Sequence, residues 1–270
     1  MPILNKDMTL CISLAARPSN IGTRFHNYLY DLLGLNFIYK AFAPADITAA
    51  VAGIRGLPIR GAAVSMPYKE AVIPLLDRMH PSARAIDSVN TIVNDDGVLT
   101  GYNTDYIAIA RLLADHRVPA FHSVLLQGSG GMAKAVAAAL RDAGFRTVTI
   151  VARNEETGRA LADLYGFRWR SEVGSSTADL IINVTPLGMA GADEASQSFA
   201  DATAAAAQEV FDVVALPSET PLIKAARAAG KPVITGAEVI AIQAEEQFVL
   251  YTGVRPTPEQ VRAASEFSRA

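Results

Sequence analysis

Short apolar runs typical of β-strands alternate, in the first half of the chain, with longer segments whose apolar residues recur at helical spacing. Three of these runs predict strands, at Leu10–Leu14, Phe37–Phe42 and Gly61–Ser65. Three further segments predict helices, at Phe25–Leu33, Ile47–Gly53 and, broken near Pro74, Glu70–Leu76. Around the turn Asn94–Gly97, the runs Ser88–Val93 and Val98–Thr100 predict a β-hairpin, because an Asp-Gly pair favours a tight turn.

The second half repeats the order of strand and helix more regularly. Its predicted strands are Val124–Gln127, Thr147–Ala152, Leu180–Val184, Val210–Val214 and Val233–Thr235. Its predicted helices are Met132–Asp142, Thr157–Tyr165, Leu222–Ala229, Glu238–Leu250 and Pro258–Ser268. Nearly continuous apolar strands separated by helices are typical of a parallel sheet covered on both faces. The pattern therefore predicts an α/β protein with a doubly wound, Rossmann-type domain.

Length and composition bound the function. A chain of 270 residues is long enough for two domains, and we expect their boundary near Asn103–Arg117, where a helix over Tyr106–Ala114 would join them. With 50% hydrophobic and 19% charged residues the chain is globular, not disordered. Its net charge of −3 argues against a nucleic-acid binder.

Cysteine content and hydropathy exclude further classes. The single cysteine, Cys11, excludes an intrachain disulfide framework and a cysteine-rich zinc site, and the sequence predicts no metal site. No run approaches 18 apolar residues, and the first residues lack the features of a signal peptide. We therefore expect a cytoplasmic protein with no membrane partner.

The strongest local motif is the glycine-rich turn Gly128–Gly131, which a predicted strand enters and a predicted helix leaves. Glycines there let the backbone turn tightly and approach a pyrophosphate at the helix N-terminus. We therefore assign Gly128, Gly130, Gly131, Met132 and Ala133 to cofactor binding, with a plain flexible turn as the alternative.

The end of the next predicted strand indicates which dinucleotide binds. An NAD site would carry an acidic residue there, whereas this chain has Arg153 and Asn154. A guanidinium suits a 2′-phosphate, and the asparagine amide can donate beside it. NADP is favoured over NAD, with a solvated loop arginine as the alternative.

Polar residues near predicted strand ends of the first half offer acid–base chemistry. Lys69 lies just beyond one strand, and the clusters Ser88–Thr91 and Asn103–Asp105 follow. A lysine–aspartate pair can exchange a proton with a hydroxyl or carbonyl group, because the carboxylate orients the ammonium. The alternative for Lys69 is a solvated surface charge.

The order and spacing of these motifs resemble the shikimate/quinate dehydrogenase family over nearly the whole chain. The resemblance rests on Phe25–Asn27, Ser65–Lys69, Ser88–Thr91, Asn103–Asp105, Gly128–Gly131, Asn183–Pro186, Glu219–Leu222 and Gln243–Ala244. It implies that Lys69 and Asp105 form the catalytic pair. It also implies that Ser65, Asn90 and Gln243 bind substrate hydroxyls. Besides the glycine-rich turn, the cofactor residues that it implies are Arg153, Asn154, Thr185 and Gly236.

This chain also departs from the family pattern. Where the family has a Ser-x-Ser element that binds the substrate carboxylate, this chain has Asn20 and Gly22, with Ser19 and Thr23 nearby as further candidates. Glu238 places a carboxylate near the expected nicotinamide site, and Ala215 replaces a usual tyrosine. Such changes are typical of a divergent, shikimate dehydrogenase-like subclass.

The resemblance implies an NADP-dependent dehydrogenase of aromatic amino acid biosynthesis that interconverts shikimate and 3-dehydroshikimate, and the departures predict slow turnover. Residues 1–105, completed by C-terminal helices in 236–270, would form the substrate-binding domain, and 106–235 the NADP-binding domain. The alternatives are a quinate or related polyol-acid dehydrogenase, and a cofactor-binding regulatory protein with little catalysis. The expected partner is a small hydroxy acid, and the expected state a monomer or homodimer.

Overall fold

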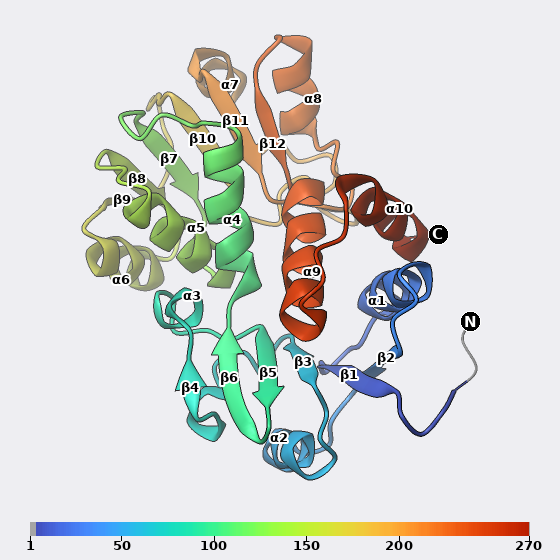
Figure 1. Ribbon diagram of the computed structural model, residues 1–270. Helices are drawn as coiled ribbons and strands as arrows, with labels where there is room; N and C mark the ends of the chain where they lie inside the picture. Colours follow the sequence, from blue (N-terminus) through green and yellow to red (C-terminus); the bar gives the residue numbers. More distant parts are fainter. Residues whose placement is uncertain (1–3, 270) are drawn as a thin grey trace. The chain divides into compact units, whose positions relative to one another are not determined.

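Two six-stranded sheets organise the computed structural model, which describes residues 4–269 (Figure 1). One unit contains the described residues through Thr104 together with those from Ala241 onward, and the other contains Asp105–Ile240. The helices α4 (Thr104–Asp115) and α9 (Gly236–Thr252) each contribute residues to both units. The prediction of an α/β fold is confirmed.

The sheet of the first unit is mixed. Its order is β2 (Phe37–Phe42), β1 (Thr9–Leu14), β3 (Gly61–Val64), β5 (Thr91–Asp95), β6 (Val98–Tyr102) and β4 (Arg78–Met79). β1 pairs in parallel with β2 and β3, whereas β5 is antiparallel to β3 and β6. Asp96 and Gly97 join β5 to β6 with φ values of 52° and 89°. Two positive φ angles are those of a type I′ turn, so the predicted hairpin is confirmed.

Both faces of this sheet are covered by apolar side chains. Its helices are α1 (Asn20–Leu32), α2 (Ile47–Gly56), the short α3 (Pro81–Arg84) and α10 (Pro258–Arg269), with a 3₁₀ turn at Ile73–Leu75. Side chains of β1 alternate between the two faces. Cys11 packs with residues of α1, α9 and α10, while Ile12 and Leu14 pack with residues of α2. The prediction that Cys11 is a small core residue is confirmed.

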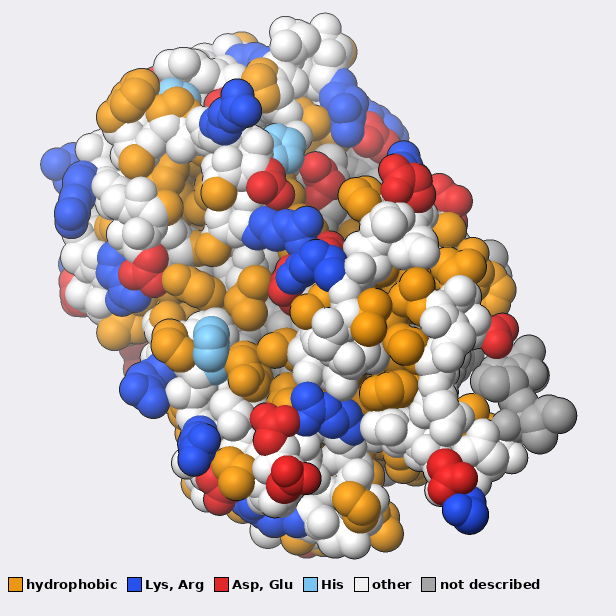
Figure 2. All heavy atoms as spheres, viewed as in Figure 1, with side chains coloured by type: hydrophobic (Ala, Val, Ile, Leu, Met, Phe, Trp, Pro, Cys, Tyr) orange, Lys and Arg blue, Asp and Glu red, His pale blue; other side chains and the backbone are white. Residues whose placement is uncertain are grey.

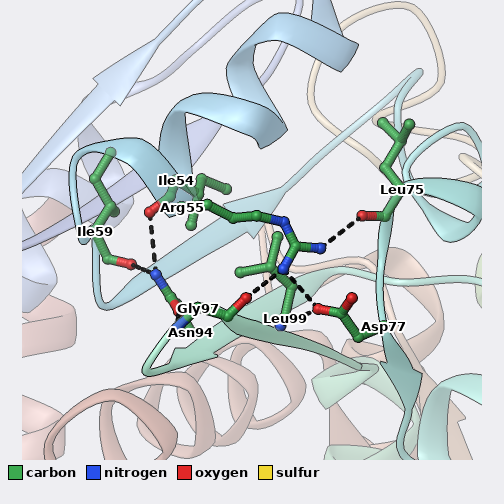
Figure 3. A network of polar contacts seen from close by, with 8 residues as sticks. All are labelled: Ile54, Arg55, Ile59, Leu75, Asp77, Asn94, Gly97 and Leu99. Carbon is green, nitrogen blue, oxygen red and sulfur yellow. Dashed lines mark hydrogen bonds and ion pairs between the residues drawn. The ribbon is translucent and has the colours of Figure 1, made fainter.

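A polar network fastens α2 to the hairpin (Figure 3). Arg55 of α2 donates to Asp77 at 2.7 Å and also to the Gly97 carbonyl. Asn94 donates to the Ile54 carbonyl near the end of α2 at 3.0 Å and accepts from Gly97 N at 2.7 Å. The buried Asn94 amide thus satisfies a carbonyl near the helix end and a turn N–H at once.

The sheet of the second unit is parallel throughout. Its order is β12 (Val233–Thr235), β11 (Glu209–Asp212), β10 (Leu180–Asn183), β7 (Val124–Gln127), β8 (Val148–Val151) and β9 (Arg168–Arg170). Its other helices are α5 (Gly131–Asp142), α6 (Glu155–Tyr165), α7 (Asp201–Ala206) and α8 (Pro221–Ala228). This is the Rossmann strand order, with its switch point between β7 and β10. The predicted Rossmann-type domain is confirmed.

One predicted helix is confirmed with an earlier start, and another prediction was wrong. The first helix begins at Asn20 rather than Phe25, because Ser19 takes the extended N-cap conformation and the glycine at position 22 is accommodated in the first turn. A helix over Glu70–Leu76 does not form. Only the 3₁₀ turn is present there, since Pro74 lacks the N–H that an α-helix would need.

The charges on the surface and the hydropathy of the helices concern the predicted absence of nucleic-acid and membrane partners. Acidic and basic side chains lie close to one another over the face shown in Figure 2. Within residues 4–269, no helix is both long and apolar enough to cross a membrane. The cytoplasmic location and the oligomeric state stay predictions.

Candidate functional site

In the first unit, backbone hydrogen bonds bring three predicted substrate and catalytic residues together. Val64 N donates to the Asn90 carbonyl at 2.8 Å, so the start of β5 lies beside the end of β3, where Ser65 follows. Val89 N donates to the Lys69 carbonyl at 2.9 Å. Segments that are distant in sequence therefore place the exposed Ser65, the half-buried Lys69 and the buried Asn90 in one neighbourhood.

The Asn90 side chain links this neighbourhood to α4 and α9. Its Oδ1 accepts from Thr91 Oγ1 at 2.9 Å, from Thr104 N at 2.8 Å and from Thr104 Oγ1 at 3.1 Å. Gln243 Nε2 donates to Thr104 Oγ1 at 3.2 Å. Asp105 follows Thr104 in the first turn of α4. Asn90 and Gln243 are thus joined through Thr104, directly before the predicted catalytic aspartate.

The other end of the Asn90 amide is unsatisfied. The residue is only 3% exposed, and its Nδ2 has no hydrogen-bond partner within residues 4–269. Buried polar groups are nearly always paired in folded proteins, so an orphaned donor needs an explanation. An acceptor oxygen of a bound molecule would satisfy it.

The predicted carboxylate site lies in the first turn of α1. Asn20 is exposed, whereas the Thr23 hydroxyl oxygen is buried and has no partner in the described part of the chain. A Cβ added at Gly22 would meet Tyr39 Oη at 3.7 Å, an ordinary contact, and its φ is not positive. This glycine is therefore not required by the backbone.

In the second unit, the glycine-rich turn follows β7 at the switch point. Gly128 has a φ of +126°, and a Cβ there would lie 2.7 Å from Val184 Cγ2. Gly130 and Gly131 face open space and form the N-cap and first residue of α5. The N-terminus of α5 is thereby accessible to an anion.

The two other predicted residues of this turn differ in burial. Met132 is half-buried, and the Ala133 side chain is fully buried. Ala133 can offer a cofactor only its backbone N–H.

We expect Gly128→Ala to lower the free energy of unfolding by about 1–3 kcal/mol, since it combines a strained φ with a steric clash. Gly130→Ala is the matched control, because its Cβ meets nothing within 4 Å. It should leave stability nearly unchanged and weaken dinucleotide binding instead. Urea unfolding beside calorimetric titration measures both effects, and equal stability of the two variants would contradict the prediction.

Arg153 and Asn154 are both exposed and follow β8. Asn154 is the N-cap of α6, and its Oδ1 accepts from Thr157 N at 3.0 Å. Its amide nitrogen is the group left to donate to a ligand. Glu155 lies in the first turn of α6, where the helix dipole favours an acidic side chain. Its carboxylate also pairs with Arg159 at 2.7 Å.

Thr185 belongs to a buried network at the ends of β10 and β11. Asn183 Nδ2 donates to Asp212 Oδ1 at 3.0 Å, and Asp212 Oδ2 accepts from Thr220 Oγ1 at 2.7 Å. Burial raises the pKa of Asp212. Thr185 donates through N and Oγ1 to Asn183 Oδ1, at 3.0 and 2.7 Å. The Thr185 hydroxyl is therefore committed to shaping the loop.

Gly236 and Glu238 shape the start of α9. A Cβ at Gly236 would lie 2.3 Å from the Val213 carbonyl oxygen, so only glycine fits. The Glu238 carboxylate accepts from Thr235 N at 2.8 Å and from Thr235 Oγ1 at 2.7 Å, and it lies 3.2 Å from His116 Nε2. This is a capping box, a role that the sequence reasoning missed although the Thr-x-x-Glu spacing signals it.

Comparisons with known proteins agree with these motifs. A family model described as the shikimate dehydrogenase substrate binding domain matches residues 20–92. A shikimate dehydrogenase-like protein from Haemophilus influenzae is 54% identical over 268 residues, covering 99% of each chain.

Two solved structures are similar over nearly the full length. Shikimate 5-dehydrogenase from Thermus thermophilus, in complex with NADP(H) and shikimate, is 28% identical with a TM-score of 0.85, covering 97% of this chain and 100% of that one. Quinate dehydrogenase from Corynebacterium glutamicum, in complex with NAD, is 28% identical with a TM-score of 0.87, covering 96% and 98%. The chain belongs to the shikimate/quinate dehydrogenase family.

Proposed function

We propose that this protein is an NADP-dependent dehydrogenase that interconverts shikimate and 3-dehydroshikimate. The observation that carries the proposal is the buried, unpartnered Nδ2 of Asn90, in the neighbourhood of Lys69. A ring that carries several hydroxyls supplies the acceptor that this donor lacks. The Thermus relative, which was solved with NADP(H) and shikimate, supports the choice of substrate and cofactor.

The second unit offers groups that fit a phosphorylated dinucleotide. Gly130 and Gly131 would present backbone N–H groups to the pyrophosphate at the start of α5. Arg153 and the Asn154 amide nitrogen would hold the 2′-phosphate, and Gly236 would lie near the nicotinamide. When bound, NADP accepts or supplies the hydride.

The chain's own residues would manage the proton and the orientation of the substrate. Lys69 would exchange a proton with the oxygen of the ring carbon that is oxidised or reduced, as a general acid–base. Asp105, in the first turn of α4, would orient the ammonium. Ser65, Asn90 and Gln243 would bind the substrate hydroxyls.

Initial rates with shikimate and with quinate, each with NADP and with NAD, test the proposal directly. We expect the highest kcat/KM with shikimate and NADP. A higher kcat/KM with quinate would show that quinate is the preferred substrate, and a higher kcat/KM with NAD would show that NAD is the preferred cofactor. Binding of NADP without turnover of either acid would favour a regulatory protein and contradict the enzyme.

One observation favours the second candidate, a quinate or related polyol-acid dehydrogenase. The serine pair of the family is absent from the first turn of α1, where Asn20 and Gly22 stand instead. A changed carboxylate site fits a changed substrate. A purely regulatory protein is less well supported, since it has no need of the proton-transfer pair Lys69 and Asp105.

The cofactor assignment predicts a selective loss. Arg153→Ala should weaken NADP binding by about 1.5–3 kcal/mol, the scale of a hydrogen bond to a charged group, and leave NAD binding nearly unchanged. Arg159→Ala is the matched control, because that guanidinium is paired with Glu155 and lies 4.3 Å from the centre of the Trp169 ring. Calorimetric titration measures both. Equal losses for the two cofactors in Arg153→Ala would show that this residue does not contact the 2′-phosphate.

A further inference from the structure

Two glutamines of α9 each donate a hydrogen bond to a threonine hydroxyl, and both hydroxyls donate to the same oxygen atom of Asn90. Gln243 and Gln247 are four residues apart and therefore share a helix face. Gln243 Nε2 donates to Thr104 Oγ1 at 3.2 Å, and Gln247 Nε2 donates to Thr91 Oγ1 at 2.9 Å. Both hydroxyls in turn donate to Asn90 Oδ1, at 3.1 and 2.9 Å. The two hydrogen-bond chains start on α9 and end on the same oxygen.

The direction of these hydrogen bonds follows from the donors. A glutamine NH₂ group can only donate, so each threonine oxygen accepts from α9 and keeps its own proton for Asn90. Thr104 N adds a third donor to Asn90 Oδ1 at 2.8 Å. Turning the Asn90 amide over would place its NH₂ against these three donors. Oδ1 therefore stays on these three donors, and Nδ2 remains the unpartnered atom.

Gln247 is buried, and His26 packs beside the next residue of α9, Phe248, with ring centroids 6.1 Å apart. Burial lowers the pKa of His26 to about 3, so the ring is neutral. It is stacked on Tyr39 with ring centroids 4.4 Å apart. Gln247 Nε2 donates to Thr91 Oγ1 at 2.9 Å and to the Asn90 carbonyl at 3.3 Å. These two acceptors set the orientation of the Gln247 amide.

We propose that Gln247 is a positioning residue for the dehydrogenase reaction. Through Thr91, and in parallel with Gln243 acting through Thr104, it orients Asn90 so that Nδ2 meets a substrate hydroxyl. The same contacts fix the start of α4, where Asp105 is the next residue. This inference rests on the proposed function for its substrate, while the orientation of Asn90 can be measured without one.

Two conservative variants test the proposal. Gln247→Met removes the donor and keeps a long side chain, and Thr91→Val removes the hydroxyl and keeps the volume. We expect each to lower kcat/KM for the turned-over acid by about 10- to 100-fold, the scale of a displaced positioning group. The Kd for NADP should stay within about twofold, which a general loss of structure would not spare. The double variant should lose no more than the worse single variant, because both break one chain of hydrogen bonds.

Thr203→Val is the matched control. Thr203 is buried in the second unit and donates to the Ser176 carbonyl at 3.3 Å, a hydrogen bond that shares no residue with these contacts. It should shift Tm about as much as Thr91→Val does and leave kcat/KM unchanged. Folded Gln247→Met and Thr91→Val variants with kcat/KM within twofold of the parent would overturn the proposal and leave Gln247 a structural residue.

A second measurement separates this inference from the proposed function. An inactive parent protein would refute the function, and the side-chain NH₂ resonances of Asn90, assigned by their loss in Asn90→Asp, would then decide the inference. We expect them to be sharp in the parent and in Thr203→Val, and shifted or broadened in Gln247→Met. Unchanged resonances in Gln247→Met would overturn it.

Discussion

Lys69→Ala is expected to lower kcat for shikimate oxidation by about 10²–10⁴-fold, the usual contribution of a positioned acid–base group, with little change in the Kd for NADP. The reason is local. The Lys69 carbonyl accepts from Val89 N, which fixes this residue beside Asn90, the proposed contact of a substrate hydroxyl. Initial rates at saturating cofactor measure the change in kcat, and calorimetric titration measures the Kd for NADP.

Two further variants show whether the loss belongs to proton transfer. Lys40→Ala removes an exposed lysine of β2 whose Nζ lies 5.1 Å from the centre of the Phe42 ring. This variant should leave kcat within twofold of the parent value. Asp105→Asn should act on the same step as Lys69→Ala, so the double variant should lose far less than the product of the single effects. Turnover near the parent value in Lys69→Ala would remove this lysine from the mechanism.

The parts of the fold that the sequence predicted are those with long, regular patterns. In the second unit β7, β8, β11 and β12 are each followed by a helix long enough to show its period, and the glycine-rich turn marks the first crossing. Short elements escaped because a few residues carry no period. β4, for example, has two residues, Arg78 and Met79, and exists because they pair with Thr100 and Gly101 of β6. Such pairing is a tertiary contact that a local pattern does not contain.

The site residues also divide into those that a local sequence pattern predicts and those that depend on tertiary contacts. Motif order predicted Lys69, Asn90 and Gln243 as site residues, and backbone and side-chain hydrogen bonds bring the segments that carry them together. Which atom of the Asn90 amide stays unpaired depends on its contact with Thr104, at the start of α4. That contact could not be predicted from the local sequence around Asn90. Glu238 is the opposite case. Its capping role could have been predicted from Thr235 three residues earlier.

The last prediction concerns the first turn of α1, where the chain departs from the family. Ser19 is the N-cap and makes no side-chain cap hydrogen bond. Asn20 and Gly22 therefore lie where the free N–H groups and the dipole of the helix favour a carboxylate. Gly22 contributes no side-chain donor there. Because a Cβ there would make only ordinary contacts with Tyr39, the nearest at 3.7 Å, a serine can be introduced at this position.

We expect Asn20→Ser combined with Gly22→Ser to raise kcat/KM for shikimate by roughly 10- to 150-fold. That is the value of one hydrogen bond of about 1.5–3 kcal/mol to a charged acceptor. Tm should stay level or rise slightly, since a glycine within a helix costs about 0.5–1 kcal/mol. Gly53→Ser, at an open position of α2, repeats the helical substitution away from the site and should change Tm alone. A folded double variant without a gain in kcat/KM would show that the substrate carboxylate is held by other residues, or that shikimate is not the substrate that this helix start selects.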